Sequence, residues 1–342
     1  MIKIAVDAMG SDNSPYSEIE GAVQAVKAYD VHVILVGKES LLAPLLKESG
    51  GEGLSIEIRN ATQVVAMDES PTAALRKKRD SSIRVAADLV REKVASGLVS
   101  AGNTGAVMAI SKMVFGVVPG VDRPALAAIL PTLAGHAVLL DVGANVTCKP
   151  HHLVQFAVMG HLFSKKIVGV ATPRVGLMSV GEEESKGNDL TKEVHKTLKQ
   201  LHLNFIGNVE GRDIYNGRAD VIVCDGFTGN VALKTSEGLI EATLKLLKDE
   251  LSRNLQAKLG ALLSQRSFKR LKKRLDYSEY GGAPLLGLRG ASIICHGRSS
   301  SNAIKNAIRV AKEFAENQVN AKLETELGQI SRETDGITAL GV

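Results

Sequence analysis

Short β-branched runs alternate with segments of helical periodicity along almost the whole chain. Strand-like runs that end in glycine or polar residues include IKIAVDAMGSD, VHVILVG, GLVSAGNTGA, AVLLDVGANV, RVGLMSVG, DVIVCDGFTG and SIICHGRSS. Helix-like segments such as SEIEGAVQAVKAY and SNAIKNAIRVAKEFAENQ lie between such runs. Alternation of this kind is typical of a mostly parallel sheet with helices on both faces. We therefore predict an α/β fold, with one domain over residues 1–318 and a polar, loosely held tail over residues 319–342.

One turn pattern, V-x-x-G-x-T-G-x-V, occurs twice, as VSAGNTGAV at residues 99–107 and VCDGFTGNV at residues 223–231. Each copy follows an apolar run and precedes a helix-like segment. Glycines let the backbone approach a ligand closely, and a hydroxyl beside the free amides of a helix N-terminus can bind an anion. The alternative is that the glycines only form tight turns and that Thr104 and Thr228 cap helices. The repetition favours two loops that face one cleft.

Polar and glycine residues gather where the predicted strands end, which is where open α/β sheets bind their ligands. They are Asp7, Asp12, Gly102, Asn103, Thr104, Gly105, Asp141, Asn145, residues 181–187, residues 225–230 and residues 296–302, which begin with His296. This accumulation is the strongest sign of a site that the residues alone give.

Several common sites are absent from the sequence. The chain has no G-x-x-x-x-G-K-[ST], G-x-G-x-x-G, G-x-S-x-G or H-E-x-x-H pattern, so nucleotide, zinc-hydrolase and serine-hydrolase chemistry are disfavoured. His151, His152 and His161 lack Cys or Glu partners at metal-ligand spacing and are interpreted as surface and core residues. Aromatic residues make up 4% of the chain, and Trp is absent, which argues against nucleic-acid stacking. We expect no cofactor, metal or nucleic acid.

The positive charge is concentrated in one segment. The 342 residues include 42 Lys and Arg and 37 Asp and Glu, but residues 251–276 hold eight basic side chains and one acid. Leucines recur there at three- and four-residue steps, which predicts a protruding amphipathic helical segment over residues 247–280. It could be a solvated face, lie on an anionic membrane or receive an acidic protein. The candidate contacts are Leu255, Leu259, Leu263, Lys269, Arg270, Lys272, Lys273 and Arg274.

No leader peptide is recognisable at the start, MIKIAVDAMG, and no apolar run reaches the roughly 18 residues that span a bilayer. Three distant cysteines, Cys148, Cys224 and Cys295, fit a reducing compartment better than a disulfide framework. We expect a cytoplasmic protein.

Taken together, the motifs closely resemble the PlsX-type phosphate acyltransferases of bacterial phospholipid synthesis. The segments that carry the resemblance run in the family's order and are AVDAMGSD, LRKKRDSS, SAGNTGA, RPALAAILPT, LLDVGANVTCKP, GEEESKGN, ADVIVCDGFTGNVALKTSEG, YSEYGGAPLLGLRG and CHGRSSSNAI. The chain departs from the family pattern at Ser11, Asn13 and Thr147, where the family usually has Gly, His and Asp. Asn13 is therefore not interpreted as a catalytic base.

The resemblance implies a reaction, a fold and a set of partners. Acyl-[acyl carrier protein] and inorganic phosphate would give acyl phosphate and free carrier protein, and a glycerol-3-phosphate acyltransferase would consume the product. The resemblance also implies a fold like that of the isocitrate and isopropylmalate dehydrogenases, a homodimer, and peripheral attachment to the cytoplasmic membrane. The alternatives are a phosphate acetyltransferase that uses acetyl-CoA, a dehydrogenase of the same fold and a non-catalytic membrane scaffold.

This chemistry suggests roles for the residues at the strand ends. Phosphate is available as a dianion at neutral pH, so the enzyme must bind it and align it rather than supply a strong base. We hypothesise that one glycine loop cradles phosphate and the other contacts the thioester, with Arg79 and Lys186 as cations for phosphate and His296 as the group that protonates the leaving thiolate. The predicted catalytic residues are His296, Lys186 and Asp225. The predicted substrate-binding residues are Asp7, Asp12, Arg79, Gly102, Asn103, Thr104, Gly105, Asp141, Asn145, Gly226, Phe227, Thr228, Gly229 and Asn230.

Overall fold

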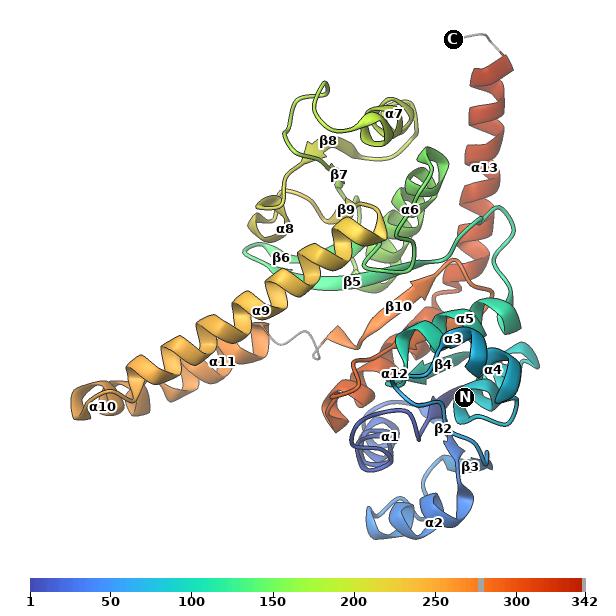
Figure 1. Ribbon diagram of the computed structural model, residues 1–342, viewed down its shortest axis with the longest axis vertical. Helices are drawn as coiled ribbons and strands as arrows, with labels where there is room; N and C mark the ends of the chain where they lie inside the picture. Colours follow the sequence, from blue (N-terminus) through green and yellow to red (C-terminus); the bar gives the residue numbers. More distant parts are fainter. Residues whose placement is uncertain (276–279, 340–342) are drawn as a thin grey trace.

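The computed structural model describes residues 1–275 and 280–339 and contains one mixed sheet flanked by helices (Figure 1). Its strands are built from short apolar runs rich in Val, Ile, Leu and Ala. Their bounds are β1 (Ile2–Asp7), β2 (Val31–Gly37), β3 (Ile56–Asn60), β4 (Gly97–Ser100), β5 (Ala125–Thr132), β6 (Gly135–Leu140), β7 (Val175–Met178), β8 (Phe205–Val209), β9 (Val221–Val223), β10 (Ala283–Leu286) and β11 (Ala291–Ile294).

Helices connect most of the strands, and several begin at a side chain that caps the first free amides. The helices before the second glycine loop are α1 (Tyr16–Ala28), α2 (Glu39–Glu48), α3 (Pro71–Lys77), α4 (Ser82–Arg91), α5 (Thr104–Phe115), α6 (Pro150–Phe163), the π-helical turn η1 (Ser164–Val168), α7 (Asp189–Leu198) and α8 (Asp213–Asn216). Those after it are α9 (Gly226–Leu251), α10 (Leu255–Leu263), α11 (Gln265–Leu275), α12 (Ser301–Glu316) and α13 (Val319–Ala339).

The sheet is mostly parallel and is covered on both faces, as the sequence predicts. The strand order is β3-β2-β1-β4-β11-β10-β5-β6-β9-β7-β8, with antiparallel pairing only where β10 meets β11 and β5 and where β5 meets β6. Successive residues of a strand point to opposite faces. In β1, Ala5 therefore packs with α4 and α5, while Ile4 and Val6 pack with α1 and α12. In the second half of the sheet, α6 and α13 cover one face.

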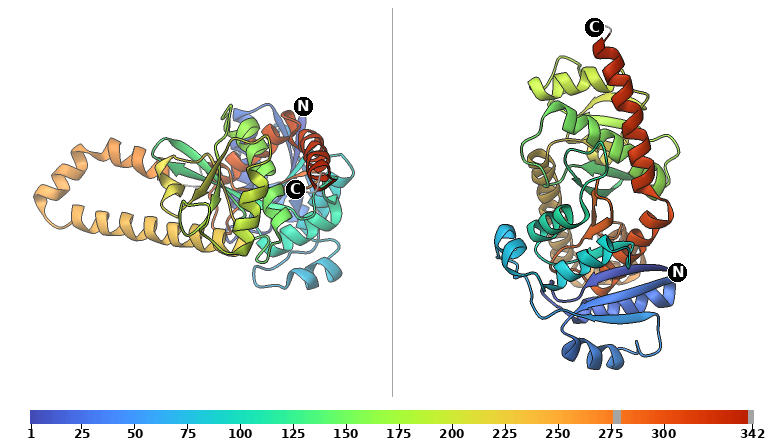
Figure 2. Two further views of the ribbon diagram at one scale, coloured as in Figure 1. Left: turned by 90° about the horizontal axis from the view of Figure 1, so that it is seen from above. Right: turned by 90° about the vertical axis from the view of Figure 1, so that its right-hand side faces the viewer.

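The basic segment leaves the body of the protein as a helical hairpin. The 26 residues of α9 bury only Gly226 and Gly229, both in its first turn, and the rest of the helix runs outward to α10, from which α11 returns (Figures 1 and 2). The predicted segment 247–280 covers the end of α9, α10 and α11, and its residues 276–279 lie outside the described residues. Within the described part, no helix combines the length and apolarity needed to cross a membrane.

The end of the described chain differs from the loosely held tail that its polar composition predicts. Residues 319–339 form α13, which packs against α6. Val319, Leu323 and Leu327 recur every four residues on one face of this helix and are buried. Three apolar residues at helical spacing are enough to hold the first half of α13 in place, although the segment is polar on average. Residues 340–342 of the predicted tail lie outside the described residues.

Candidate active site

Two groups of strands run in opposite directions, yet their carboxyl ends lie at one level of the sheet. Strands β1, β4 and β11 run one way, and β6, β7, β8 and β9 run the other way. Ser100 at the end of β4 pairs with Ile294 at the end of β11, and Leu140 pairs with Val223 at the ends of β6 and β9. When the residue pairing is followed from β11 through β10 and β5 to β6, Leu140 lies one residue away from the position opposite Ile294. The loops that follow both groups therefore start near the centre of the sheet.

The first glycine loop is fixed by Asn103. The side-chain amide of Asn103 donates to the backbone oxygens of Ala66, Met67 and Glu69 at 2.9–3.2 Å, and its oxygen accepts from the amide of Ala106 at 2.9 Å. Asn103 is thus the N-cap of α5, while Thr104 is the exposed first residue of that helix. Capping occupies Asn103 and leaves the hydroxyl of Thr104 available to a ligand.

Glycines 102 and 105 serve close packing in this loop. A side chain at Gly105 would meet Pro71 of α3 at 2.7 Å, and one at Gly102 would meet Asp7 at 3.2 Å. Asp7 itself is buried and accepts from the hydroxyl of Ser100 at 2.7 Å. Burial raises the pKa of Asp7, and the hydrogen bonds from neighbouring serines oppose that shift. Asp7 and Gly102 hold the loop by close packing, while Gly105 also lines a separate small pocket of about 200 Å³ beside Asn145.

The second glycine loop is capped differently, because its helix begins two residues earlier in the pattern. Asp225 is the N-cap of α9 and accepts from the amides of Phe227 and Thr228 at 3.0 and 2.9 Å. The Thr228 hydroxyl also donates to Asp225, at 2.8 Å. The caps are therefore Asn103 and Asp225, not Thr104 and Thr228. Phe227 is 61% exposed.

The first turn of α9 packs directly on the loop after β6. A side chain at Gly226 would meet the backbone of Asn145 at 2.8 Å, and one at Gly229 would overlap the carbonyl oxygen of Asp141. Asp141 accepts five hydrogen bonds of 2.7–3.2 Å, from the amides of Leu126, Gly143, Ala144 and Asn145 and from the side chain of Asn145. Asp141 and Asn145 thus organise the loop on which α9 begins.

A pocket of about 200 Å³ lies between the two glycine loops. Thr104 comes from the first loop, Asn230 from the second and His296 from the loop after β11, so three predicted site residues lie together. The other lining residues are Leu126, Ala128, Ile129, Leu130, Val142, Leu233, Lys234, Glu237, Gly282, Ala283, Ile294 and Cys295. One wall is therefore apolar and the other carries hydrogen-bonding and charged groups.

His296 is exposed, and its Nδ1 accepts from the amide of Arg298 at 3.2 Å. In the neutral ring this arrangement puts the proton on Nε2, which can then donate to a ligand. Cys295 also lines the pocket, but burial raises the pKa of its thiol to about 12. The thiol therefore stays protonated at neutral pH and is a poor nucleophile.

Lys234 is the pocket cation that the sequence analysis did not identify. It lies on α9 and pairs with Glu237, with 2.7 Å between Lys234 Nζ and the carboxylate. Lys234 follows Asn230 by four residues on one helix, so the two side chains share a face. The sequence could have identified Lys234, because a helix that begins at the second glycine loop places residue 234 on the same face as Asn230.

Other predicted residues are not among those that line the pocket. Arg79 is exposed in the connection between α3 and α4, and Lys186 is exposed in the connection between β7 and α7. The amide of Asp12 donates to the carbonyl of Gly297 at 2.9 Å, so Asp12 lies beside the loop that contains His296. The structure thus brings Asp12 close to the site and keeps Arg79 and Lys186 outside this pocket.

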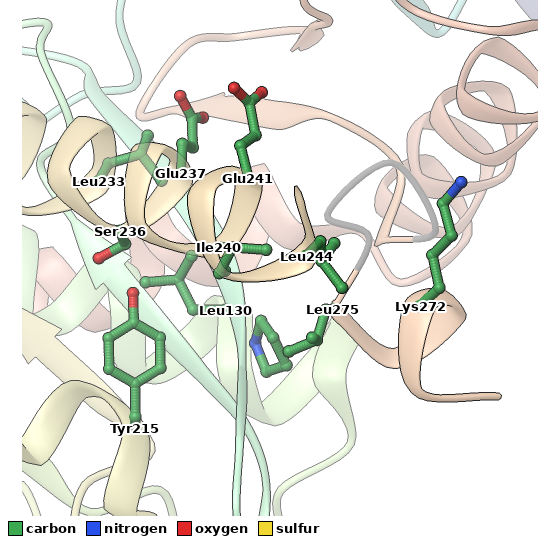
Figure 3. A pocket seen from close by; sticks show the side chains of 11 residues that line it. Leu130, Tyr215, Leu233, Ser236, Glu237, Ile240, Glu241, Leu244, Lys272 and Leu275 are labelled. Carbon is green, nitrogen blue, oxygen red and sulfur yellow. The ribbon is translucent and has the colours of Figure 1, made fainter. Parts of the chain in front are cut away.

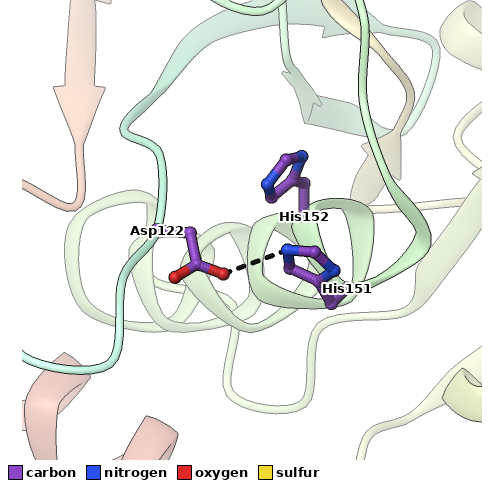
Figure 4. A group of neighbouring side chains, drawn as sticks. All are labelled: Asp122, His151 and His152. Carbon is purple, nitrogen blue, oxygen red and sulfur yellow. Dashed lines mark ion pairs between the residues drawn. The ribbon is translucent and has the colours of Figure 1, made fainter.

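Away from the pocket, one group of side chains combines possible metal donors (Figure 4). His151 Nε2 lies 3.1 Å from the carboxylate of Asp122, and ligand atoms of these two residues and His152 lie within 4.8 Å of one another. His152 is buried, and its Nδ1 accepts from the amide of Lys149 at 3.0 Å. Asp122 lies far from the histidines in sequence, which is why spacing did not reveal the group.

Comparison with known proteins identifies the family. The family model described as fatty acid synthesis protein matches residues 2–322. The chain is 58% identical over 324 residues to a phosphate acyltransferase of Acidobacterium capsulatum, covering 94% of this chain and 96% of that protein. It is 54% identical over 326 residues to a phosphate acyltransferase of Geotalea uraniireducens, covering 95% and 94%. The chain belongs to the PlsX-type phosphate acyltransferases. It is an enzyme that transfers acyl groups, as the sequence motifs predict.

Solved structures confirm the fold class of this phosphate acyltransferase. EutD phosphotransacetylase from Staphylococcus aureus matches with a TM-score of 0.60 at 18% identity, covering 92% of this chain and 94% of the other. A 4-hydroxythreonine-4-phosphate dehydrogenase from Klebsiella pneumoniae matches with a TM-score of 0.50 at 13% identity, covering 92% and 99%. The predicted likeness to dehydrogenases therefore holds for the fold.

Proposed function

We propose that the enzyme converts acyl-[acyl carrier protein] and inorganic phosphate to acyl phosphate and free carrier protein. The observation that carries this proposal is the two-sided pocket between the glycine loops. Its apolar wall, from Leu126 to Leu130, suits the start of an acyl chain. Its polar wall offers Thr104, Asn230 and Lys234 to a phosphate and a thioester carbonyl.

In the proposed reaction a phosphate oxygen attacks the carbonyl carbon of the thioester, and the carbon–sulfur bond breaks. Lys234 and the Thr104 hydroxyl hold the phosphate, and the Asn230 amide donates to the carbonyl oxygen as negative charge develops there. Nε2–H of His296 donates a hydrogen bond to the leaving sulfur, and the thiolate becomes a thiol by taking the proton that the hydrogen phosphate dianion loses as it becomes acyl phosphate. No covalent enzyme intermediate is needed.

This assignment divides the work between the two loops as the sequence analysis suggested. The first loop supplies Thr104 for phosphate, and the second supplies Asn230 for the thioester. The glycines and the two caps, Asn103 and Asp225, position these side chains. Lys186 and Arg79 are retained as candidate cations only for a state in which their loops move toward the pocket or a second copy contributes them.

The hairpin is proposed to bind the carrier protein and an anionic membrane surface. Leu255, Leu259 and Leu263 on α10 are 85%, 60% and 80% exposed, and α11 has a row of exposed cations. Apolar side chains beside cations suit a membrane interface, and the cations suit an acidic carrier protein. We further propose that the enzyme is a homodimer and that it acts in the cytoplasm. A glycerol-3-phosphate acyltransferase would consume its acyl phosphate product.

A phosphate acetyltransferase that uses acetyl-CoA is the rival function. The phosphotransacetylase structures share the fold only, at 18% identity. The apolar wall of the pocket extends well beyond what an acetyl group needs. Comparing kcat/KM for palmitoyl-[acyl carrier protein] and acetyl-CoA separates the two, and a preference for acetyl-CoA would favour the rival.

Two variants test the phosphate site. Lys234→Met and Thr104→Ala should each raise the phosphate KM, by about ten-fold or more for Lys234→Met, because a charge-assisted hydrogen bond is worth roughly 1.5–3 kcal/mol. Thr228→Ala should leave that KM unchanged, because its hydroxyl donates to Asp225 instead. Lys192→Met, an exposed lysine on α7, is the charge control. An unchanged phosphate KM in both test variants would contradict the assignment.

A further inference from the structure

A second, mainly apolar cavity of about 250 Å³ lies under α9, next to the active-site pocket. Figure 3 shows Leu130, Ile240 and Leu244 turned toward a common space, whereas the carboxylates of Glu237 and Glu241 point to the other side of α9. Its full lining is Leu130, Pro131, Tyr215, Leu233, Ser236, Glu237, Ile240, Glu241, Leu244, Lys272 and Leu275. The cavity is thus a partly open hollow bordered by β5, α8, α9 and α11.

This cavity lies next to the active-site pocket on one side and next to the hairpin on the other. It shares Leu130, Leu233 and Glu237 with the active-site pocket. At its far end it shares Glu241, Leu244 and Lys272 with a hollow of about 870 Å³ between α9 and the two following helices. From Asn230 to Leu244 the path follows α9 for about 21 Å, at 1.5 Å per residue. We call the path lined by Leu130, Leu233, Ile240, Leu244 and Leu275 the α9 channel.

The channel has the chemistry of a site for a hydrocarbon chain. Leucine and isoleucine side chains supply most of its lining, and the hydroxyls of Tyr215 and Ser236 lie on one side of it. Its charged lining residues lie where it meets the neighbouring hollows. A long chain would gain roughly 25 cal/mol for each Å² of apolar surface that leaves water. An acetyl group would gain nothing from it, because the channel begins beyond the site of reaction.

We propose that the acyl chain of the substrate extends from the active-site pocket into the α9 channel, where Ile240 and Leu244 set the preference for long chains. This inference rests on the proposed function and adds the chain-binding subsite. The reacting carbonyl would lie beside Asn230 and Lys234, and the chain would run along α9 toward the hairpin.

The hairpin then forms part of the subsite, because α11 supplies one of its walls. Leu275 and Lys272 of α11 line the channel. The guanidinium of Arg274 donates to the carbonyl oxygen of Thr132 at 2.7 Å, at the end of β5. This bond ties α11 to the body of the protein and keeps the wall next to β5. Arg274 was predicted as a membrane or carrier-protein contact, and the structure gives it this anchoring role.

Filling the channel tests the inference. Ile240→Trp places a bulky side chain in the channel, so the ratio of kcat/KM for palmitoyl- to hexanoyl-[acyl carrier protein] should fall by about ten-fold or more. Leu239→Trp is the matched control, because Leu239 is the preceding residue of α9, is 67% exposed and does not line the channel. That control should keep the wild-type ratio. An unchanged ratio in Ile240→Trp, or an equal fall in both variants, would overturn the inference.

A measurement on the unaltered enzyme keeps the test independent of folding. A palmitoyl-[acyl carrier protein] analogue with a diazirine at the end of its chain should cross-link, on illumination, to peptides that contain Leu244, Leu275 or Pro131. Cross-links confined to other peptides would overturn the inference. Failure of the proposed function is a separate result, because the wild-type enzyme would then form no acyl phosphate from either chain length.

Discussion

Glu18 on α1 is fully buried, and burial raises the pKa of its carboxyl to about 7. The nearby Asp7 contributes to the same shift. The pKa of Glu18 is higher in the folded protein than in the unfolded chain, so the folded protein holds this proton more tightly. The contribution of Glu18 to the free energy of unfolding is therefore largest below about pH 4.5 and is lost as the pH rises through about 7. The wild-type free energy of unfolding should fall by about 2–3 kcal/mol between pH 5 and pH 8 from this group alone.

Glu18→Gln should remove this part of the pH dependence, as measured by urea unfolding at pH 5 and pH 8. Glu20→Gln on the same helix is the control, because Glu20 is exposed. The same fall in stability in wild type and Glu18→Gln would show that Glu18 does not titrate in this range.

At the residue scale, the sequence predicted which loops matter better than which atoms face the ligand. Thr104, Asn230 and His296 were identified and lie around one pocket. Asp141 was identified from the same pattern, but its carboxylate is used up by five hydrogen bonds within the protein. Internal hydrogen bonding and ligand binding use the same polar residue types, so a one-dimensional pattern cannot separate them.

At the scale of elements, the hairpin gives a prediction about membranes. Replacing Leu255, Leu259 and Leu263 together by Glu should release the protein from anionic vesicles in a sedimentation assay, because three exposed leucines become negative. The control is Leu246→Glu, which changes a comparably exposed leucine on α9. This variant should bind the vesicles nearly as well as the wild-type protein does. Equal vesicle binding by the triple variant and wild type would return α10 to the interpretation of a solvated face.

The helices of this hairpin were predictable because leucine and cation periodicity is a local signal. The contact between the hairpin and the rest of the protein was not predictable, because Arg274 donates a hydrogen bond to Thr132, a residue 142 positions earlier in the chain. The packing of α13 on α6 was hidden for the same reason. Apolar residues spaced by four gave the only sequence signal for that contact.

At the scale of the whole molecule, alternation of strand and helix predicted the α/β fold and its mostly parallel sheet. It did not predict that the two parallel groups run in opposite directions and end at one level, with β10 and β5 between them. That arrangement brings together two glycine loops separated by more than a hundred residues. It also accounts for the repeated turn, because two loops of one kind can supply opposite sides of one pocket.

The central claim is tested most directly by the reaction itself. Purified protein is incubated with palmitoyl-[acyl carrier protein] and inorganic phosphate, and free carrier-protein thiol and acyl phosphate are measured together. Our account predicts that thiol release depends on phosphate and is matched mole for mole by acyl phosphate. No thiol release, or release that proceeds without phosphate, would contradict it.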